Sequence, residues 1–330
     1  MRKLNSKKGI ALKITVVGAG GIGCYYAAKL IQAGHAVKLI ARGDHLKAMQ
    51  EQGLAVKHAS LHFNQMVDAT SLDQWLGEAK PDDVDLIIVC LKAMQTRVFA
   101  DQLSRWYQQY EGCELPLMLS LQNGVENEKQ FAKVLPKGTV LGGIARRIGA
   151  HIIQPGTVES IGPAQVILGA WPNSKGLNES LLQKINNLAK CFNDAGIPTE
   201  TSDDINKELW LKLIINNGLN PLCALLELET GEATPDLDLM PLIKGAMKEA
   251  VMAAKANDVE LSSDDLEEMF ELIATFDSIK PSMLVDREKG RPLEIEEICG
   301  VVIRGCEKIG KDAPYNKVIS TLLRRAVEND

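Results

Sequence analysis

Residues 13–23 read Lys-Ile-Thr-Val-Val-Gly-Ala-Gly-Gly-Ile-Gly, and this stretch decides the fold of the first half of the chain. Lys13–Val17 is short, β-branched and followed at once by glycines, which predicts a buried strand. The glycines satisfy the spacing G-x-G-x-x-G, and a helical pattern then runs from about Ile22 to Ala33 and stops at Gly34. This order is typical of a dinucleotide-binding unit; the alternative is a glycine-rich turn that binds no ligand.

Each glycine of the motif has a separate physical task. Gly18 permits a tight turn, Gly20 lets the backbone approach a pyrophosphate, and Gly23 packs the helix on the strand. The helix N-terminus offers N–H groups and a partial positive charge to phosphates. The predicted cofactor contacts in this loop are Gly18, Ala19, Gly20, Gly21, Ile22 and Gly23.

The end of the second predicted strand, Ala36–Ile40, indicates which dinucleotide binds. An enzyme that uses NAD usually has Asp or Glu there, where its carboxylate bonds the ribose 2′-hydroxyl. This chain reads Ile40-Ala41-Arg42-Gly43, so a guanidinium stands where the acid is expected. Because Arg can pair with a 2′-phosphate, NADPH is the predicted cofactor. In the alternative, Arg42 is a solvated loop residue and Asp44 supplies the carboxylate that bonds the ribose 2′-hydroxyl.

Strands and helices alternate over the rest of the first half, which predicts an α/β fold with a Rossmann-type, doubly wound parallel sheet. Further strands are expected at Val84–Leu91, Leu115–Leu121 and Thr139–Ile144, with helices at Gln95–Gln109, Asn127–Leu135 and Ser180–Ala195. Thr157–Ile161 and Gln165–Leu168 are expected to form a hairpin at the sheet edge. Beyond Thr201 the pattern is helical, including Pro241–Asn257, Ser263–Thr275 and Leu293–Lys308. The expected organisation is a disordered tail (1–12), a cofactor-binding domain (13–200) and an all-helical substrate and catalytic domain (201–330), with the site in a cleft between the domains.

Composition narrows the class of protein. The chain of 330 residues is 45% hydrophobic and carries a net charge of -6, which argues against a nucleic-acid partner. No apolar run approaches the ~18 residues of a membrane span, and the basic start lacks the apolar segment of a signal peptide. Seven cysteines without C-x-x-C spacing indicate neither a disulfide framework nor a metal site. A reducing compartment, the cytoplasm, is therefore expected.

Three polar residues recur on an otherwise apolar helical segment. Lys212, Asn216 and Asn220 are spaced i, i+4, i+8, so a continuous helix would place them in one stripe. Buried ammonium and amide groups need partners, and a substrate could be one. The alternative is a turn, because Asn216-Asn217-Gly218 is a strong turn signal and Pro221 follows.

Four other residues allow both a functional and an ordinary interpretation. Glu294 opens a predicted helix, where acids are commonly helix-dipole partners, and Ser282 could be only an N-cap. Asn123 follows an apolar strand in an Asn-Gly turn, at the edge where ligands bind in open α/β sheets. Lys92 lies at a similar edge or is a solvated strand-end lysine. His58 and His62 are i, i+4 but lack further metal ligands nearby, so surface positions are expected.

From Lys13 to about Leu323 the sequence resembles the ketopantoate reductase (2-dehydropantoate 2-reductase) family. Four stretches carry the resemblance: Val17–Gly23; Leu91-Lys92 with Gln122-Asn123-Gly124; Leu209–Asn216 with Asn220-Pro221-Leu222; and Ser282–Asp286 with Gly290-Arg291 and Glu294-Ile295. The last two are fairly specific to this family, whereas many dehydrogenases share the first.

The resemblance implies a role for each matching residue. Lys212 is similar to the family's proton donor, and Glu294 to the acidic residue at the reaction centre. Substrate ligands are implied at Asn123, Asn216, Asn220 and Ser282, and cofactor contacts at Arg42, Lys92, Asn123 and Ala150. The sequence departs from the family at Thr230, Pro281 and Leu293, where Asn, Ser and Thr are common. These departures put the substrate in doubt more than the type of reaction.

The implied activity is the NADPH-dependent reduction of 2-dehydropantoate to (R)-pantoate, in the pathway to pantothenate and coenzyme A. Two alternatives stay open: reduction of another 2-oxo acid, and a non-catalytic NADPH-binding or redox-sensing protein. The expected partner is a small 2-oxo acid, without nucleic acid, membrane or metal. A homodimer is one assembly that the sequence allows.

Overall fold

The computed structural model describes residues 11–110, 112–276 and 278–329. By their contacts, the residues divide into two compact units. The first unit runs to Gln122 and from Asn127 to Ile205; the second, the helical unit, comprises Asn123–Glu126 and the chain from Asn206 onward. Of the expected tail at 1–12, residues 1–10 lie outside the described residues, whereas the N–H of Leu12 donates to His35 Nδ1 over 3.1 Å.

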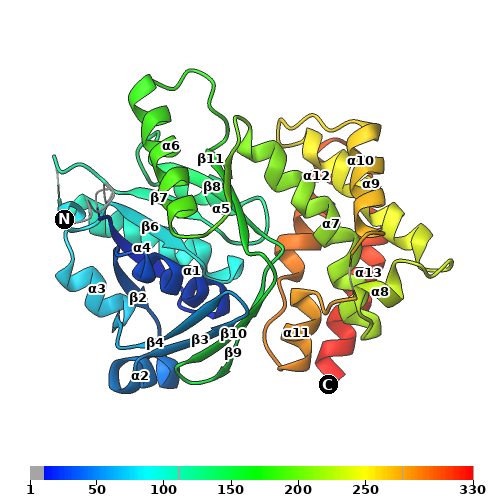
Figure 1. Cartoon of the computed structure of the whole chain (residues 1–330). Coiled ribbons are helices and arrows are strands. Elements are labelled where there is room, and N and C mark those ends of the chain that lie inside the picture. Colours follow the sequence, from blue (N-terminus) through cyan, green and yellow to red (C-terminus); the bar gives the residue numbers. More distant parts are fainter. Residues whose placement is uncertain (1–10, 111, 277, 330) are drawn as a thin grey trace, which may run out of the picture. The chain divides into compact units, whose positions relative to one another are not determined.

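An eight-stranded sheet forms the centre of the first unit (Figure 1). Its order is β12-β11-β8-β7-β6-β1-β2-β5, with β1 Lys13–Val17, β2 Ala36–Ile40, β5 Asp68–Thr70, β6 Leu86–Val89, β7 Leu117–Ser120, β8 Val140–Arg146, β11 Gln165–Ala170 and β12 Thr199–Thr201. All neighbouring strands are parallel except β8 and β11. The order changes direction at β1, whose neighbours are β2 and β6, and ligands bind at such a switch point. The predicted doubly wound sheet is confirmed.

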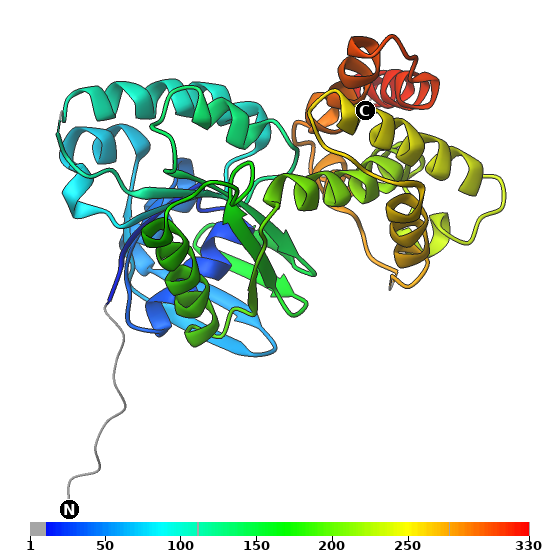
Figure 2. The same ribbon diagram turned by 90° about the horizontal axis from the view of Figure 1, so that it is seen from above.

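Helices cover both faces of this sheet (Figure 2). On one face α1 (Gly21–Gln32) and α6 (Glu179–Asp194) pack in an apolar cluster that includes Val16. On the other face α3 (Leu72–Glu78), α4 (Thr96–Gln108) and α5 (Asn127–Ala132) pack in a cluster that includes Val17. Successive side chains of β1 enter opposite clusters, so the strand is buried on both faces, and Thr15 is the one polar residue among its four buried positions. The remaining helices are α2 (Gly43–Gln52), η1 (Pro81–Asp83) and η2 (Ala93–Gln95).

A second sheet in the first unit was not predicted. Its order is β4-β3-β10-β9, with β3 Leu54–His58, β4 Leu61–Gln65, β9 Gly149–Gln154 and β10 Thr157–Ile161. The predicted hairpin of Thr157–Ile161 with Gln165–Leu168 is wrong, because β10 pairs with β3 and β9 whereas β11 pairs with β8 and β12. Between them Gly162 and Ala164 adopt φ values of 87° and 56°, and Ala164 N–H donates to Arg147 O over 3.1 Å. This turn carries the chain from one sheet to the other.

The second unit consists of helices, as predicted for the chain beyond Thr201. They are α7 Ile205–Leu226, α8 Thr230–Ala233, α9 Met240–Lys255, α10 Ser263–Ile273, α11 Ser282–Glu288, the π-helical turn η3 Glu296–Gly300, α12 Val301–Lys308 and α13 Pro314–Asn329. The predicted helix Leu293–Lys308 therefore begins later and contains a π-helical turn. Glycines let α9 approach its neighbours, because a Cβ at Gly218 of α7 or Gly305 of α12 would lie 2.7 Å from Met247 Cγ or Ala253 Cβ, respectively.

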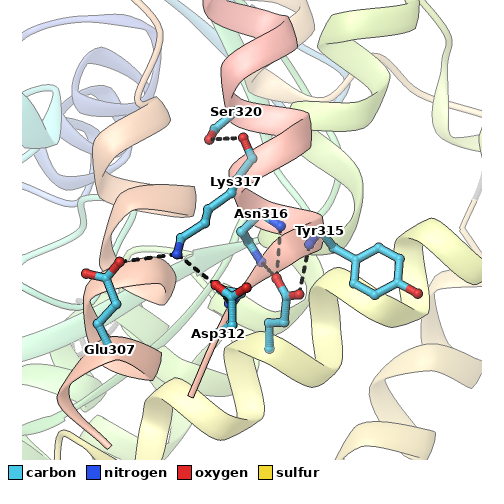
Figure 3. A network of polar contacts seen from close by, with 8 residues as sticks. Glu307, Asp312, Tyr315, Asn316, Lys317 and Ser320 are labelled. Atoms are coloured by element: carbon cyan, nitrogen blue, oxygen red, sulfur yellow. Dashed lines mark hydrogen bonds and ion pairs between the residues drawn. The ribbon is translucent and has the colours of Figure 1, made fainter. Parts of the chain in front are cut away.

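A buried carboxylate on α9 holds the beginning of α13. Glu249 is 3% exposed and accepts hydrogen bonds of 2.9 Å from the backbone N–H groups of Tyr315 and Asn316. In the same turn, Lys317 forms an ion pair of 2.7 Å with Asp312 (Figure 3). An anion at a helix N-terminus is favourable because it meets the N–H groups that lack partners within the helix.

By length and composition, α7 could cross a membrane, since an 18-residue window has a mean hydropathy of 1.3. It is the one helix among the described residues that passes this test. However, 67% of the window is buried inside the protein, which is typical of the core helix of a soluble protein. Burial therefore accounts for its apolar composition.

Candidate functional site

The glycine-rich turn joins β1 to α1 at the carboxyl edge of the eight-stranded sheet. Gly18 has a φ of 98°, which residues with a side chain rarely adopt, and a Cβ there would lie 2.7 Å from the carbonyl carbon of Cys90. The N–H groups of Gly18 and Ala19 donate to the carbonyl of Ile40 over 3.2 and 2.9 Å. The turn is thereby held against the chain that leaves β2 and β6.

The other glycines of the motif differ in what surrounds them. A Cβ at Gly21 would overlap the carbonyl of Ala150 in β9, and a Cβ at Gly23 would overlap the carbonyl of Gly18. In contrast, no atom lies within 4 Å of the Cβ position of Gly20, which is the N-cap of α1 and makes no side-chain cap hydrogen bond. Two glycines thus serve the packing of the protein, whereas Gly20 leaves room for a ligand at the helix N-terminus.

Arg42 stands at the carboxyl end of β2, exposed and in the N-cap position of α2. It is two residues beyond Ile40, whose carbonyl holds the glycine-rich turn. Asp44 is also exposed but lies within the first turn of α2, where an acid interacts favourably with the helix dipole. The guanidinium, rather than the carboxylate, therefore stands at the strand tip.

Lys92 lies just beyond β6, half-buried and directly ahead of η2. Buried hydrogen bonds fix the chain around it: Gln122 Nε2 donates to Leu91 O over 3.1 Å and to Thr96 Oγ1 over 2.8 Å. The Thr96 hydroxyl in turn donates to Asn127 Oδ1 over 2.7 Å. Gln122 and Asn127 flank the segment Asn123–Glu126, so both ends of this segment are anchored. Sequence reasoning noted Gln122 only within a motif and missed this network.

In the helical unit, α7 is unbroken from Ile205 to Leu226, so the alternative turn at Asn216-Asn217-Gly218 does not form. Lys212, Asn216 and Asn220 therefore follow one line along the helix. Lys212 and Asn216 are half-buried, and Asn220 is 6% exposed. The helix thus presents one ammonium and two amides in a row on a largely apolar surface.

The structure brings Glu294 and Asn123 together, although they are far apart in the sequence. Glu294 precedes η3 and is 5% exposed, and the side-chain amide of Asn123 donates to its Oε2 over 3.4 Å. Three residues further, Glu126 pairs with Arg304 of α12 over 2.8 Å. The segment Asn123–Glu126 is therefore attached to the helical unit at both its ends.

Ser282 is the first residue of α11 and is exposed, and Pro281 holds the N-cap position. The alternative that Ser282 is only an N-cap is therefore wrong. The same helix supports α7, because Arg287 Nη1 donates to the carbonyls of Ala224 and Leu225 over 2.6 and 3.0 Å. A cation that caps the last carbonyls of a helix is stabilising.

Thr230, one of the departures from the family pattern, has its hydroxyl occupied. It donates to Ile279 O over 3.2 Å and accepts from Ile279 N–H over 3.0 Å. Thr230 is also 3% exposed. Its hydroxyl joins α8 to the chain before α11 and its only proton is already used, so it cannot donate to a substrate without breaking the bond to Ile279.

The cysteines and the histidines His58 and His62 show no sign of a functional site. All seven cysteines are free thiols, and burial raises the pKa of Cys90 and Cys299 to about 12. His58 and His62 lie in the β3–β4 hairpin and not on a helix. Among the residues that the structure describes, no group of three His, Cys, Asp or Glu residues could hold a metal ion.

Comparison with known proteins connects both units to one family. Residues 14–173 match the family model described as ketopantoate reductase PanE/ApbA, and residues 204–327 match the model of its C terminal. A 2-dehydropantoate 2-reductase from Pyrococcus abyssi is 29% identical over 313 residues, which cover 95% of this chain and 97% of that protein.

Solved structures give the same result. A PanE/ApbA family ketopantoate reductase from Ralstonia eutropha is 30% identical with a TM-score of 0.81, covering 96% of this chain and 99% of that one. A 2-dehydropantoate 2-reductase from Geobacter metallireducens is also 30% identical, with a TM-score of 0.79 and coverage of 96% and 100%. The likeness thus extends over nearly the full length of each protein.

Proposed function

Because this chain belongs to the ketopantoate reductase family, we propose that it catalyses the NADPH-dependent reduction of 2-dehydropantoate to (R)-pantoate, a step towards pantothenate and coenzyme A. The observation that carries the proposal is the unbroken α7, which aligns Lys212, Asn216 and Asn220 as the family pattern requires. A sensor that only bound the cofactor would not need this row of polar groups on an apolar helix.

The residues of the first unit fit a dinucleotide. Gly20 leaves open space at the uncapped start of α1, where a pyrophosphate can accept backbone N–H groups. Ala150 packs against Gly21 and so borders the same turn. Arg42 would pair with the 2′-phosphate, and Lys92 would contact the cofactor from the end of β6. When bound, NADPH supplies a hydride to the keto carbon of the substrate.

The residues of the helical unit then manage the charge on the substrate. Negative charge develops on the keto oxygen as the hydride arrives, and the Lys212 ammonium stabilises it and donates the proton that completes the alcohol. Asn216, Asn220 and Ser282 hold the substrate through its polar groups. Glu294 accepts a hydrogen bond from the substrate hydroxyl and helps to orient Lys212, and Asn123 holds Glu294 in turn. Lys212 afterwards regains its proton from water.

The enzyme acts in the cytoplasm on a small molecule. Seven free thiols support a reducing compartment, and the net charge of -6 disfavours binding to nucleic acid.

A second candidate function is the reduction of another 2-oxo acid. It is favoured by Thr230, whose hydroxyl is bound to the backbone of Ile279 and therefore does not replace the amide that the family commonly has there. One fewer polar contact to the substrate would relax the selectivity of the site.

Steady-state NADPH oxidation with a panel of 2-oxo acids tests the proposal. We expect the highest kcat/KM with ketopantoate, and a loss of about tenfold or more when its hydroxyl is absent. A higher kcat/KM for another acid would establish the second candidate. No oxidation with any acid, by a protein that binds NADPH, would contradict both.

A further inference from the structure

Asn217 lies on α7 beside Asn216 but belongs to a different set of contacts. Its side chain is 1% exposed, and its Nδ2 donates to the carbonyl of Ile298 over 3.1 Å and to Asn316 Oδ1 over 2.6 Å. Asn316 Nδ2 then donates to Glu249 Oε2 over 2.8 Å. A buried chain of hydrogen bonds therefore runs from η3 through α7 and α13 to α9, and Figure 3 shows its Asn316 end.

The direction of this chain is fixed by its two ends. A carboxylate can only accept, so Asn316 donates its amide N–H to Glu249 and turns its Oδ1 towards Asn217. Asn217 Nδ2 then donates both to Asn316 Oδ1 and to the Ile298 carbonyl. All of these side chains are at most 3% exposed. Removing a donor inside the protein leaves an acceptor without water to replace it, and that cost exceeds the cost at a surface.

The acceptor at one end lies in an unusual part of the backbone. The N–H of Ile298 bonds the carbonyl of Glu294, four residues earlier, over 3.1 Å. The N–H of Val301 instead bonds the carbonyl of Glu296, five residues earlier, which is the spacing of a π-helix. Such turns insert one residue into a helix and occur frequently at functional sites. The hydrogen bond from Ile298 to the Glu294 carbonyl links the position of Glu294 to that of η3.

We infer that Asn217 is a positioning residue: by binding the Ile298 carbonyl it holds the π-helical turn η3, and thereby the Glu294 carboxylate, in place for the reaction. The inference rests on the proposed function, because it takes Glu294 to contact the substrate. Asn217 itself contacts neither substrate nor cofactor. Its amide connects the helix that carries Lys212 with the turn that follows Glu294.

A double-mutant cycle on the full-length enzyme tests this role. Asn217→Leu has a similar volume and no donor, and we expect it to lower kcat/KM for ketopantoate by about tenfold at temperatures well below its unfolding transition. If the loss acts through Glu294, the same change in a Glu294→Gln background should cost less than about threefold, since coupled residues are non-additive. NADPH affinity, measured separately, should not change.

Asn316→Leu is the matched control. It removes the neighbouring amide but leaves the Asn217–Ile298 bond, and Glu249 still accepts from two backbone N–H groups of α13. We expect a lower unfolding temperature with nearly unchanged kcat/KM. If Asn217→Leu does not fold, Asn217→Ala, which also removes the donor and adds no volume, replaces it in the cycle.

The outcomes separate the inference from the proposed function. One outcome would overturn the inference alone: Glu294→Gln is impaired by itself, and Asn217→Leu lowers kcat/KM by the same factor with Glu294 as with Glu294→Gln. Kinetics of Glu294→Gln indistinguishable from the unsubstituted enzyme would overturn the assigned role of Glu294 and the inference with it. If Asn217→Leu lowers kcat/KM strongly when Glu294 is present and hardly at all in Glu294→Gln, the result supports both the inference and the assigned role of Glu294.

Discussion

The side-chain amide of Asn123 donates to the carboxylate of Glu294 across 3.4 Å, although 171 positions separate them in the sequence. Asn123 directly follows Gln122, which is anchored to the chain just beyond β6, and Glu294 lies two residues before the π-helical turn. A helix-dipole partner would need no such contact. The pairing places the carboxylate next to Asn123, which the family resemblance makes a substrate and cofactor contact, and this favours a functional role for Glu294.

Glu294→Gln should lower kcat/KM for ketopantoate by one to several powers of ten, equivalent to about 1.4 kcal/mol or more. The reason is the loss of a charged acceptor for the substrate hydroxyl. Stability should change little, because the new side chain keeps an oxygen that can accept from Asn123. Thermal unfolding and steady-state kinetics on the two proteins provide the measurement.

A keto acid without the hydroxyl is the control for this substitution. It never makes the contact with Glu294, so its kcat/KM should be less sensitive to the change. If Glu294→Gln instead lowered stability by ~0.3–1 kcal/mol and left kcat/KM alone, the carboxylate would be only a helix-dipole partner.

Arg42→Ala should weaken NADPH binding by about ten- to a hundredfold and leave NADH binding nearly unchanged. Charge-assisted hydrogen bonds to the 2′-phosphate contribute about 1.5–3 kcal/mol, and NADH has no such phosphate. Titration of both cofactors with both proteins gives the comparison, and Asp44→Asn is the control on the neighbouring helix turn. Equal losses for the two cofactors after Arg42→Ala would show that Arg42 does not read the phosphate.

Gly20→Ala and Gly21→Ala should distinguish a glycine that leaves room for the cofactor from a glycine that the packing of the protein requires. A Cβ at Gly20 meets no atom of the protein, so stability should stay nearly constant while NADPH affinity falls. A Cβ at Gly21 would overlap the Ala150 carbonyl, so this variant should lose stability by about 1–3 kcal/mol and affinity as well. Unfolding and NADPH titration test both variants. Unchanged affinity in Gly20→Ala would contradict the cofactor role of the turn.

Asp265→Asn should make the protein less stable at pH 7 and not at low pH. Asp265 accepts from the Ser262 N–H over 2.7 Å, which lowers the pKa of its carboxyl below 3.8, and the Lys207 ammonium at 3.0 Å lowers the pKa further. A carboxyl whose pKa is lower in the folded protein than in the unfolded chain stabilises the fold at pH values above its unfolded-state pKa. This stabilisation is lost as the pH falls through its folded-state pKa. We expect a difference of about 1 kcal/mol at pH 7.

Urea unfolding at pH 7 and in steps down to about pH 2 measures this difference in the free energy of unfolding. The stabilities of the two proteins should converge as Asp265 becomes protonated. Asp264→Asn makes the same change of charge in the same turn of α10 and is the control. A difference that stayed constant with pH would assign the effect to geometry and not to the charge.

The inner strands of the central sheet were predictable because they are buried on both faces and are largely apolar, as Val16 and Val17 illustrate. The edge strands β5 and β12 were not predicted, since they are short and partly exposed. The second sheet was not predictable, because its strands have one exposed face. His58 and His62 show the difficulty, since their spacing of four fits a helix face as well as the two strands of a hairpin. Pairing of distant strands, such as β10 with β3, leaves no local signal in the sequence.

The candidate site was predictable where it depends on local spacing. The stripe of Lys212, Asn216 and Asn220 needs only a continuous helix, and α7 is continuous. The spatial pairing of Asn123 with Glu294 and the buried bonds of Asn217 could not be predicted, because they depend on how separate elements pack. The π-helical turn that makes Ile298 part of this arrangement also has no simple sequence pattern.

The most direct test of the account is the turnover of Lys212→Ala with ketopantoate and NADPH. We expect the variant to fold and bind NADPH as the unsubstituted enzyme does, and kcat to fall by about 10²–10⁴-fold because the keto oxygen has lost its proton donor. The measurement is the rate of NADPH oxidation at saturating ketopantoate, with cofactor titration on the same sample. Near-normal turnover in this variant would show that Lys212 is structural and would contradict the proposed mechanism.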